Sequence, residues 1–230
     1  MNYLANCITV LSLICGFASI FFSLESHFTF ASWAIILSVA LDGLDGQIAR
    51  KNPAPSEFGK ELDSLVDVVS FGIAPSVLGY IFVYREFYFW AIIALFIYLF
   101  CSVMRLAKYN ITPKERMVKY FYGLPTTVSG GILASFILMY RKRQDVPLPE
   151  FVPVVFIFIV LVLAFLMVSR VKYLNLDGLI DVFGKGIVLI CSVLIVLLVM
   201  AAFLRKGGVA LFTLFLIYLI LSPFVTRRIT

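Results

Sequence analysis

Eight apolar runs restrict what this chain can fold into more than any other feature of the sequence. They cover approximately residues 4–23, 29–49, 60–84, 86–108, 121–140, 151–169, 184–204 and 208–226. A helix needs about 20 apolar residues to cross the hydrocarbon core of a bilayer, so each run is long enough for one span. The alternating pattern of a transmembrane β-barrel is absent from the sequence. We therefore predict an all-α, polytopic membrane bundle of about eight transmembrane helices.

The composition agrees with a membrane protein. The sequence is 62% hydrophobic and 14% charged, with a mean hydropathy of +1.05, and so lacks the polar surface that a soluble domain of this size needs. No polar linker divides it, and residues 1–230 are predicted to form one integral membrane domain. The first run lacks a basic leader and a small-residue cleavage site, which predicts a retained helix. The expected partners include membrane lipids and no nucleic acid.

The distribution of Lys and Arg predicts the orientation. Eight spans place both termini on one side, and the positive-inside rule assigns the more basic side to the cytoplasm. Thirteen cations then lie inside: Arg50, Lys51, Lys60, Arg105, Lys108, Lys114, Arg116, Lys119, Arg170, Lys172, Lys185, Arg227 and Arg228. Six lie outside: Arg85, Arg141, Lys142, Arg143, Arg205 and Lys206. The termini are therefore expected in the cytoplasm of a multi-pass cell-membrane protein.

Cysteine and histidine do not suggest a reaction centre. Four cysteines are scattered through apolar runs without a CxxC pair, which indicates packing residues rather than zinc ligands or disulfides. They are Cys7, Cys15, Cys101 and Cys191. The single histidine, His27, lies in a short polar connection. Acid–base chemistry would therefore depend on carboxylates.

The stretch Leu41–Asp67 contains four aspartates near the inner ends of two predicted spans. Ionisable groups are costly there and indicate a functional site. One helix face carries Asp42, Asp45, Gly46 and Ala49, at i, i+3, i+4 and i+7. The face of the next helix carries Gly59, Asp63 and Asp67, at i, i+4 and i+8. Pro53, Pro55 and Ser56 predict a short turn that brings the two faces together.

Four neighbouring carboxylates cannot all ionise without counter-charges. Oxygen-only ligands suit hard cations, so the pattern predicts a site for divalent metals, with room for two ions of Mg²⁺ or Mn²⁺ and with Ca²⁺ as an alternative. Such ions would clamp a pyrophosphate. The structural alternative is a set of interhelical ion pairs with Arg50, Lys51 and Lys60. Ion pairs alone would not require the small residues at Gly46, Ala49 and Gly59.

The aspartate pattern resembles the complete signature of the CDP-alcohol phosphotransferase family. It reads Asp42-x-x-Asp45-Gly46-x-x-Ala49-Arg50, eight further residues, and Gly59-x-x-x-Asp63-x-x-x-Asp67. The resemblance implies an integral membrane enzyme that transfers a phosphatidyl group from a CDP-activated lipid to an alcohol, with release of CMP.

The resemblance also implies roles for individual residues. Asp42, Asp45 and Asp63 would bind metal, and Asp67 would share in metal binding or act as the general base. Nucleotide binding would involve Asp42, Gly46, Ala49, Arg50 and Gly59. The polar residues Asn6 and Thr9 on the first helix resemble a pair that many members carry after a proline, whereas here Ala5 stands at that position. They are further candidates for nucleotide binding or, alternatively, form interhelical hydrogen bonds.

Three later motifs resemble the membrane-embedded phosphatidylserine synthase branch of the family. They are Phe71-Gly72-Ile-Ala-Pro75, Arg105-Leu-Ala-Lys108-Tyr109-Asn110 and Tyr122-Gly123-Leu124-Pro125. This branch implies L-serine as the acceptor. Serine needs a donor for its carboxylate and acceptors for its ammonium group. The candidates are Arg105, Asn110, Lys119, Tyr122 and Thr126. Membrane anchoring is the alternative role for Arg105 and Lys119.

Three further features of the sequence are open to interpretation, and the first two allow both a functional and a packing role. Gly72 and Pro75 would loosen or kink the third helix and shape the acceptor pocket, or serve packing alone. The Gly130-Gly131 pair is compatible with close helix packing or with a homodimer contact. Arg170, Lys172, Asp177 and Asp181 are interpreted as a solvated surface.

Two functional alternatives remain at this stage. The same chemistry could use another acceptor, such as glycerol 3-phosphate or inositol phosphate. A divalent-cation transporter is the third hypothesis, but the acids lie near one membrane face and no pair of broken helices marks inverted halves. The lipid backbone of the donor, ester or ether, stays open.

Overall fold

The computed structural model describes residues 3–50, 57–112, 120–140, 149–174 and 207–229. In chain order its elements are α1 (Tyr3–Leu24), α2 (Phe28–Arg50), α3 (Glu57–Asp67), the π-helical segment η1 (Val68–Ile73), α4 (Ala74–Ile111), β1 (Tyr120–Tyr122), α5 (Thr126–Tyr140), α6 (Phe151–Val168), β2 (Lys172–Leu174) and α8 (Gly207–Ile229). Helices satisfy every backbone polar group internally, which an apolar run in a bilayer requires.

The described helices confirm an all-α, integral membrane protein. Five stretches are long and apolar enough to cross a membrane: Leu4–Leu24, Phe28–Ile48, Glu57–Val83, Phe89–Ile111 and Phe151–Val168. Two shorter apolar helices, Thr126–Tyr140 and Gly208–Phe224, correspond to the fifth and eighth predicted spans. The seventh predicted span, 184–204, lies outside the described residues, as does the predicted turn at 51–56.

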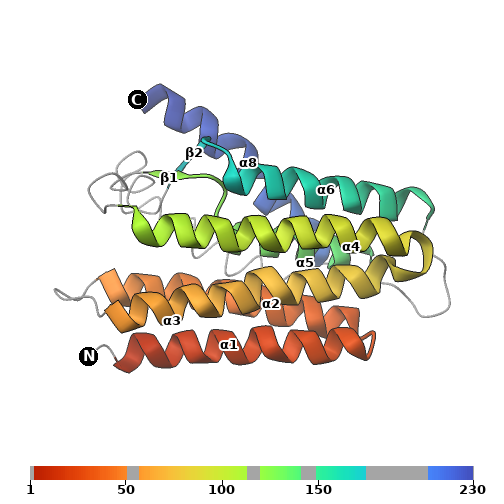
Figure 1. Ribbon diagram of the computed structural model, residues 1–230, viewed down its shortest axis with the longest axis horizontal. Coiled ribbons are helices and arrows are strands. Elements are labelled where there is room, and N and C mark those ends of the chain that lie inside the picture. Colours follow the sequence, from red (N-terminus) through yellow and green to blue (C-terminus); the bar gives the residue numbers. More distant parts are fainter. Residues whose placement is uncertain (1–2, 51–56, 113–119, 141–148, 175–206, 230) are drawn as a thin grey trace.

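The third and fourth predicted spans form a hairpin. Element α4 reverses direction within its length, at the right of Figure 1. Contacts along the chain show the same reversal, because Gly72 packs against Leu99 and Ser102 while Gly79 packs against Leu95. Two antiparallel arms therefore run side by side, the first made of α3, η1 and the beginning of α4.

The predicted start of the fifth helix was wrong by five residues. Tyr120–Tyr122 is a short strand that pairs antiparallel with Lys172–Leu174, and the helix begins only at Thr126. Gly123 follows the strand with a φ of +81°, and a Cβ there would collide with the carbonyl oxygen of Met167. Glycine is thus required where the chain turns tightly over the end of α6.

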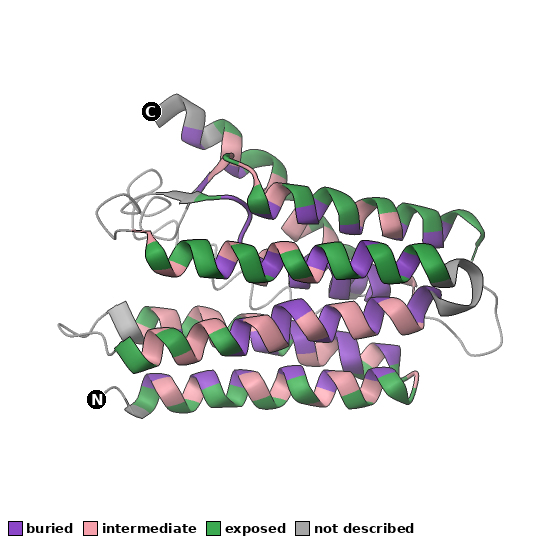
Figure 2. Cartoon of the chain, in the orientation of Figure 1, coloured by how far each residue is buried: buried purple, intermediate pink, exposed green. Residues whose placement is uncertain are grey.

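An aromatic core joins α2, α4, α5 and α6. Phe82 makes edge-on contacts with Phe28 and Phe156, whose ring centroids lie at 5.9 and 5.7 Å, and Phe136 packs against Phe156 at 5.7 Å. Buried residues follow the inward faces of the helices, and exposed ones follow the outward faces (Figure 2). Large apolar side chains such as Phe158 and Phe165 lie on the outside, which is the arrangement expected of a surface in contact with lipid.

Small residues let neighbouring elements approach η1 closely. A Cβ on Gly16 of α1 would lie 2.7 Å from the Cα of Ser70, and one on Gly130 of α5 would lie 3.2 Å from the Cβ of Phe71. Gly131 packs against the ring of Phe215 on α8. The Gly130-Gly131 pair therefore serves helix packing within the chain.

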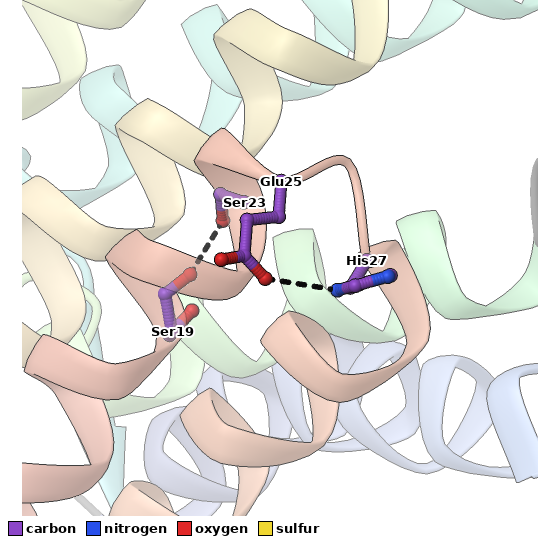
Figure 3. A network of polar contacts seen from close by, with 4 residues as sticks. All are labelled: Ser19, Ser23, Glu25 and His27. Atoms are coloured by element: carbon purple, nitrogen blue, oxygen red, sulfur yellow. Dashed lines mark hydrogen bonds and ion pairs between the residues drawn. The ribbon is translucent and has the colours of Figure 1, made fainter.

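His27 lies far from the aspartates. It follows the tight turn between α1 and α2, where its Nδ1 is 3.2 Å from Glu25 Oε2 and both side chains are at least half exposed (Figure 3). In the same view Ser23 donates a hydrogen bond to the carbonyl of Ser19. Asp42 lies fifteen positions after His27, which corresponds to about 22 Å along α2.

Candidate functional site

Three of the four predicted aspartates form one cluster. Asp42 near the end of α2 and Asp63 and Asp67 on α3 each offer a carboxylate oxygen, and these oxygens all lie within 4.8 Å of one another. Asp67 is buried, and the other two are partly buried. The cluster lies toward the end of the bundle that carries the N terminus (Figure 1). Helix periodicity had predicted this convergence.

Asp45 lies beside the cluster and is held by α1. The hydroxyl of Thr9 donates a hydrogen bond of 2.8 Å to Oδ2 of Asp45, and both residues are buried. Asp45 is still close enough to Asp42 and Asp63 to interact with their charges. The interhelical hydrogen bond anticipated for Thr9 is thus present, and its partner is one of the signature acids.

The acidic cluster fits a divalent cation. Its donors are carboxylate oxygens alone, the ligand type that Mg²⁺, Mn²⁺ and Ca²⁺ prefer. Lys60, one of the three cations considered as structural partners, instead donates from Nζ to the carbonyl of Asn110 at 2.7 Å. Lys51 and the side chain of Arg50 lie outside the described part. The arrangement is therefore better suited to metal binding than to ion pairs with Lys60.

Arg105 is the cation that the structure brings to the acids. It lies on the returning arm of α4, close enough to Asp67 and Asp42 to interact with their charges. Its Nη1 donates a hydrogen bond of 3.2 Å to Oγ1 of Thr126 at the start of α5. Its Nε is buried and has no hydrogen-bond partner among the described residues. Arg105 thus retains a donor for a further acceptor group.

Two of the other proposed acceptor residues, Asn110 and Tyr122, have no hydrogen bond to Arg105 in the part of the chain that the structure describes. Asn110 turns to α3, where its Nδ2 donates to Ser64 Oγ at 3.0 Å and Glu61 Oε2 at 3.4 Å. Tyr122, on β1, is 46% exposed. Lys119 lies outside the described residues. Among the described members of this set, the hydrogen bond between Arg105 and Thr126 is the one that joins two proposed acceptor residues.

The proposed nucleotide residues surround the same end of α1, α2 and α3. Asn6 is partly buried one turn before Thr9, and Gly46 and Gly59 are partly buried on α2 and α3. Ala49 and Arg50 complete α2, and their side chains lie outside the described part.

Helix α8 approaches the site, which the sequence did not predict. Tyr218 is close enough to Arg105 to interact with its charge, and its ring stacks on Tyr173 of β2 at a centroid distance of 6.3 Å. Tyr173 is only 1% exposed. Of the residues predicted to form a solvated surface in this connection, Arg170 is exposed and Lys172 partly buried, and Asp177 and Asp181 lie outside the described residues. No local sequence pattern marked either tyrosine as part of the site.

A π-helical segment directly follows Asp67. The run Val68–Ile73 precedes Pro75, which cannot donate a backbone hydrogen bond. The predicted disturbance near Gly72 and Pro75 is therefore confirmed, and it takes the form of a π-helix rather than a kink. Such segments occur frequently at functional sites.

Comparison with known proteins agrees with the geometry. The family model for CDP-alcohol phosphatidyltransferase matches residues 2–168. A CDP-diacylglycerol–serine O-phosphatidyltransferase of Helicobacter pylori (strain 26695) is 34% identical over 172 residues, which are 74% of this chain and 71% of the relative. Its Bacillus subtilis counterpart is 33% identical over 173 residues, 75% and 90% of the two chains.

An archaeal protein is similar over a comparable share of the chain. The archaetidylserine synthase of Methanothermobacter thermautotrophicus is 31% identical over 180 residues, 76% of this chain and 71% of the relative. The stretch matched by the family model contains the four aspartates, Arg105 and Thr126, whereas Tyr218 lies after it.

Proposed function

Because the chain belongs to the CDP-alcohol phosphatidyltransferase family, we propose that it transfers a phosphatidyl group from a CDP-activated lipid to the hydroxyl of L-serine. The products are a phosphatidylserine-type lipid and CMP. The observation that carries the proposal is the cluster of Asp42, Asp63 and Asp67 beside the guanidinium group of Arg105. The names of the bacterial and archaeal relatives support serine as the acceptor.

Asp67 acts as the general base. The serine oxygen forms a bond to the phosphorus of the phosphatidyl group, the bond from that phosphorus to the CMP oxygen breaks, and the hydroxyl proton passes to the Asp67 carboxylate. A positioned base of this kind contributes about 10²- to 10⁴-fold. No covalent enzyme intermediate is needed, because the serine hydroxyl attacks directly.

Asp42, Asp45, Asp63 and Asp67 hold the divalent metals, which we propose to be two ions of Mg²⁺ or Mn²⁺. Bound metal would neutralise charge on the phosphoryl oxygens during transfer. The hydrogen bond from Thr9 holds the carboxylate of Asp45 in place beside the other three acids. Asn6, Thr9, Asp42, Gly46, Ala49, Arg50 and Gly59 are proposed to bind the cytidine nucleotide.

Arg105 receives the carboxylate of serine. Guanidinium groups bind carboxylates through paired N–H donors, and the buried Nε of Arg105 is aligned with no other acceptor among the described residues. Thr126 fixes the opposite side of the guanidinium group through Nη1. Asn110, Lys119 and Tyr122 remain weaker proposals for the same acceptor site.

The membrane orientation is also a proposal. Thirteen cations against six place the termini and the aspartate cluster on the cytoplasmic side. CDP-lipid would then enter from the membrane with its chains against the apolar helix faces and its nucleotide at the inner ends of α2 and α3. Relatives named for diacylglycerol and archaetidyl lipids support either an ester or an ether donor.

An acceptor panel tests the proposal. The purified protein is incubated with CDP-diacylglycerol, Mn²⁺ or Mg²⁺ and one alcohol at a time, and CMP release is measured. We expect release with L-serine and little with glycerol 3-phosphate or inositol phosphate. CMP release with those alcohols but not with serine would contradict serine as the acceptor. No CMP release with any acceptor, tested with both an ester and an ether CDP-lipid, would contradict a transferase activity and favour cation transport.

A further inference from the structure

Polar contacts of Tyr98 and Ser129 lie between Thr126, which accepts a hydrogen bond from Arg105, and the backbone directly after Asp67. Arg105 donates to Thr126, and Ser129 donates to the carbonyl of Thr126 at 2.7 Å. Tyr98 donates its one hydroxyl proton to the carbonyl of Phe71 at 2.9 Å, and its oxygen lies 3.0 Å from that of Ser129, which can donate to Tyr98 in place of Thr126. Phe71 lies in η1, one turn beyond Asp67.

The bond from Tyr98 reaches a carbonyl that lies four residues before Pro75. In an α-helix the carbonyl of residue 71 would accept a hydrogen bond from the N–H of residue 75, and proline has none. The Phe71 carbonyl is also removed from water, because the residue is fully buried. The hydroxyl of Tyr98 supplies a donor to this buried carbonyl from the opposite arm of the hairpin.

The register of η1 determines where Asp67 points. A π-helical turn contains about one residue more than an α-helical turn, and each α-helical residue corresponds to about 100° of rotation. If η1 returned to α-helical register, Asp67 would rotate by a similar angle relative to the rest of the arm. Its carboxylate would then leave the group formed with Asp42 and Asp63.

We propose that Tyr98 is a positioning residue for the transfer reaction. Its hydroxyl donates to the carbonyl of Phe71 and so holds η1 in the register that directs Asp67 toward Asp42 and Asp63. Ser129 of α5 lies against the same hydroxyl and supports its position. This inference rests on the proposed function, because it concerns the same site.

The variant Tyr98→Phe removes only the hydroxyl and keeps the ring in its fully buried position. Because small displacements of a reacting group are costly, we expect kcat to fall about tenfold while the KM for CDP-diacylglycerol changes by less than about twofold. The Mn²⁺ concentration for half-maximal activity should rise, since Asp67 is part of the metal cluster. Rates are expressed per mole of folded protein, from size-exclusion chromatography in the same detergent.

Ser129→Ala and Ser135→Ala form a matched pair of variants. Both serines are fully buried on α5 and donate to the carbonyl three residues earlier, but only Ser129 also contacts Tyr98. We expect Ser129→Ala to lower kcat severalfold and Ser135→Ala to leave it within about twofold of wild type. The double variant Tyr98→Phe/Ser129→Ala should lose less than the product of the two single losses, because both act on one connection.

The outcomes separate this inference from the proposed function. Wild-type protein that releases no CMP with serine contradicts the proposed function. An active wild type with Tyr98→Phe within twofold of its kcat contradicts the positioning role. A lowered unfolding temperature with unchanged kcat and unchanged Mn²⁺ dependence would also overturn it, as would equal losses in Ser129→Ala and Ser135→Ala. If Tyr98→Phe does not fold, the comparison of the two serine variants decides.

Discussion

The hydroxyl of Thr9 on α1 donates a 2.8 Å hydrogen bond to Oδ2 of Asp45 on α2. The first helix thereby holds one acid of the signature in a fixed position beside the other three. Farther along the same two helices, Ser12 and Ser38 place their hydroxyl oxygens 2.7 Å apart, and Ser70 of η1 donates to the carbonyl of Ser12. Helix α1 is thus a scaffold for both acidic faces.

Thr9→Val should weaken metal binding. Valine keeps the shape of threonine and removes the donor, and a hydrogen bond to a charged group contributes about 1.5 to 3 kcal/mol. We expect the Mn²⁺ concentration for half-maximal CMP release to rise about tenfold, and Thr9→Ser, which keeps the hydroxyl, to stay near wild type. An unchanged Mn²⁺ requirement in Thr9→Val would show that this hydrogen bond does not support a metal ligand.

Asp63→Asn should raise the metal requirement more strongly than a change at a neighbouring acid. Glu61 lies on the same helix, is exposed, and is outside the acidic cluster. Chelation of divalent cations is expected to abolish turnover of wild type. Asp63→Asn should need at least about tenfold more Mn²⁺ than wild type for half-maximal rate, whereas Glu61→Gln should need the same amount as wild type. Equal effects of the two variants would remove the metal role from Asp63.

Arg105→Lys should weaken the binding of serine without weakening the binding of the CDP-lipid. Lysine keeps the positive charge and loses the planar, paired donors, so it binds a carboxylate less well. We expect the KM for serine to rise about tenfold while the KM for CDP-diacylglycerol changes little. Lys108→Gln, an exposed change one turn later on α4, serves as the control. A rise in the KM for the lipid donor alone would assign Arg105 to the donor instead.

Gly16→Ala should destabilise the bundle. The new Cβ would lie 2.7 Å from the Cα of Ser70, and backbone in η1 cannot easily move aside. Overpacking typically costs about 1 to 3 kcal/mol, which for a chain of this length lowers the unfolding temperature by about 3 to 10 °C. Gly43→Ala is the control, because a Cβ there would meet nothing within 4 Å. A thermal midpoint that falls equally in both variants would contradict this packing.

Local patterns predicted the features that depend on neighbouring residues. The 3.6-residue period of α2 and α3 was sufficient to bring Asp42, Asp63 and Asp67 together, since short-range spacing decides which residues share a helix face. The apolar runs predicted the spans because a bilayer requires helices of that length. Pro75 predicted a disturbance of the third helix, although the proline alone did not predict that the disturbance would be the π-helical segment η1.

Features that depend on distant segments were not predictable in the same way. Tyr122 pairs with Lys172, fifty residues later, and this pairing removes residues 120–122 from the start of the fifth helix. Asn110 satisfies its amide on α3 rather than beside Arg105. Tyr218 reaches Arg105 because α8 packs across the bundle. No local pattern encodes these contacts, since each partner is chosen by the packing of whole helices.

Transfer of radiolabelled L-serine into lipid tests the central claim most directly. Wild type and Asp67→Asn are incubated with CDP-diacylglycerol and Mn²⁺, and labelled lipid, CMP and binding of the CDP-lipid are measured together. We predict one labelled lipid per CMP in wild type, and in Asp67→Asn a loss of turnover of at least about 100-fold with most of the CDP-lipid affinity retained. CMP formed without labelled lipid, or binding and rate lost equally in Asp67→Asn, would contradict serine transfer with Asp67 as the base.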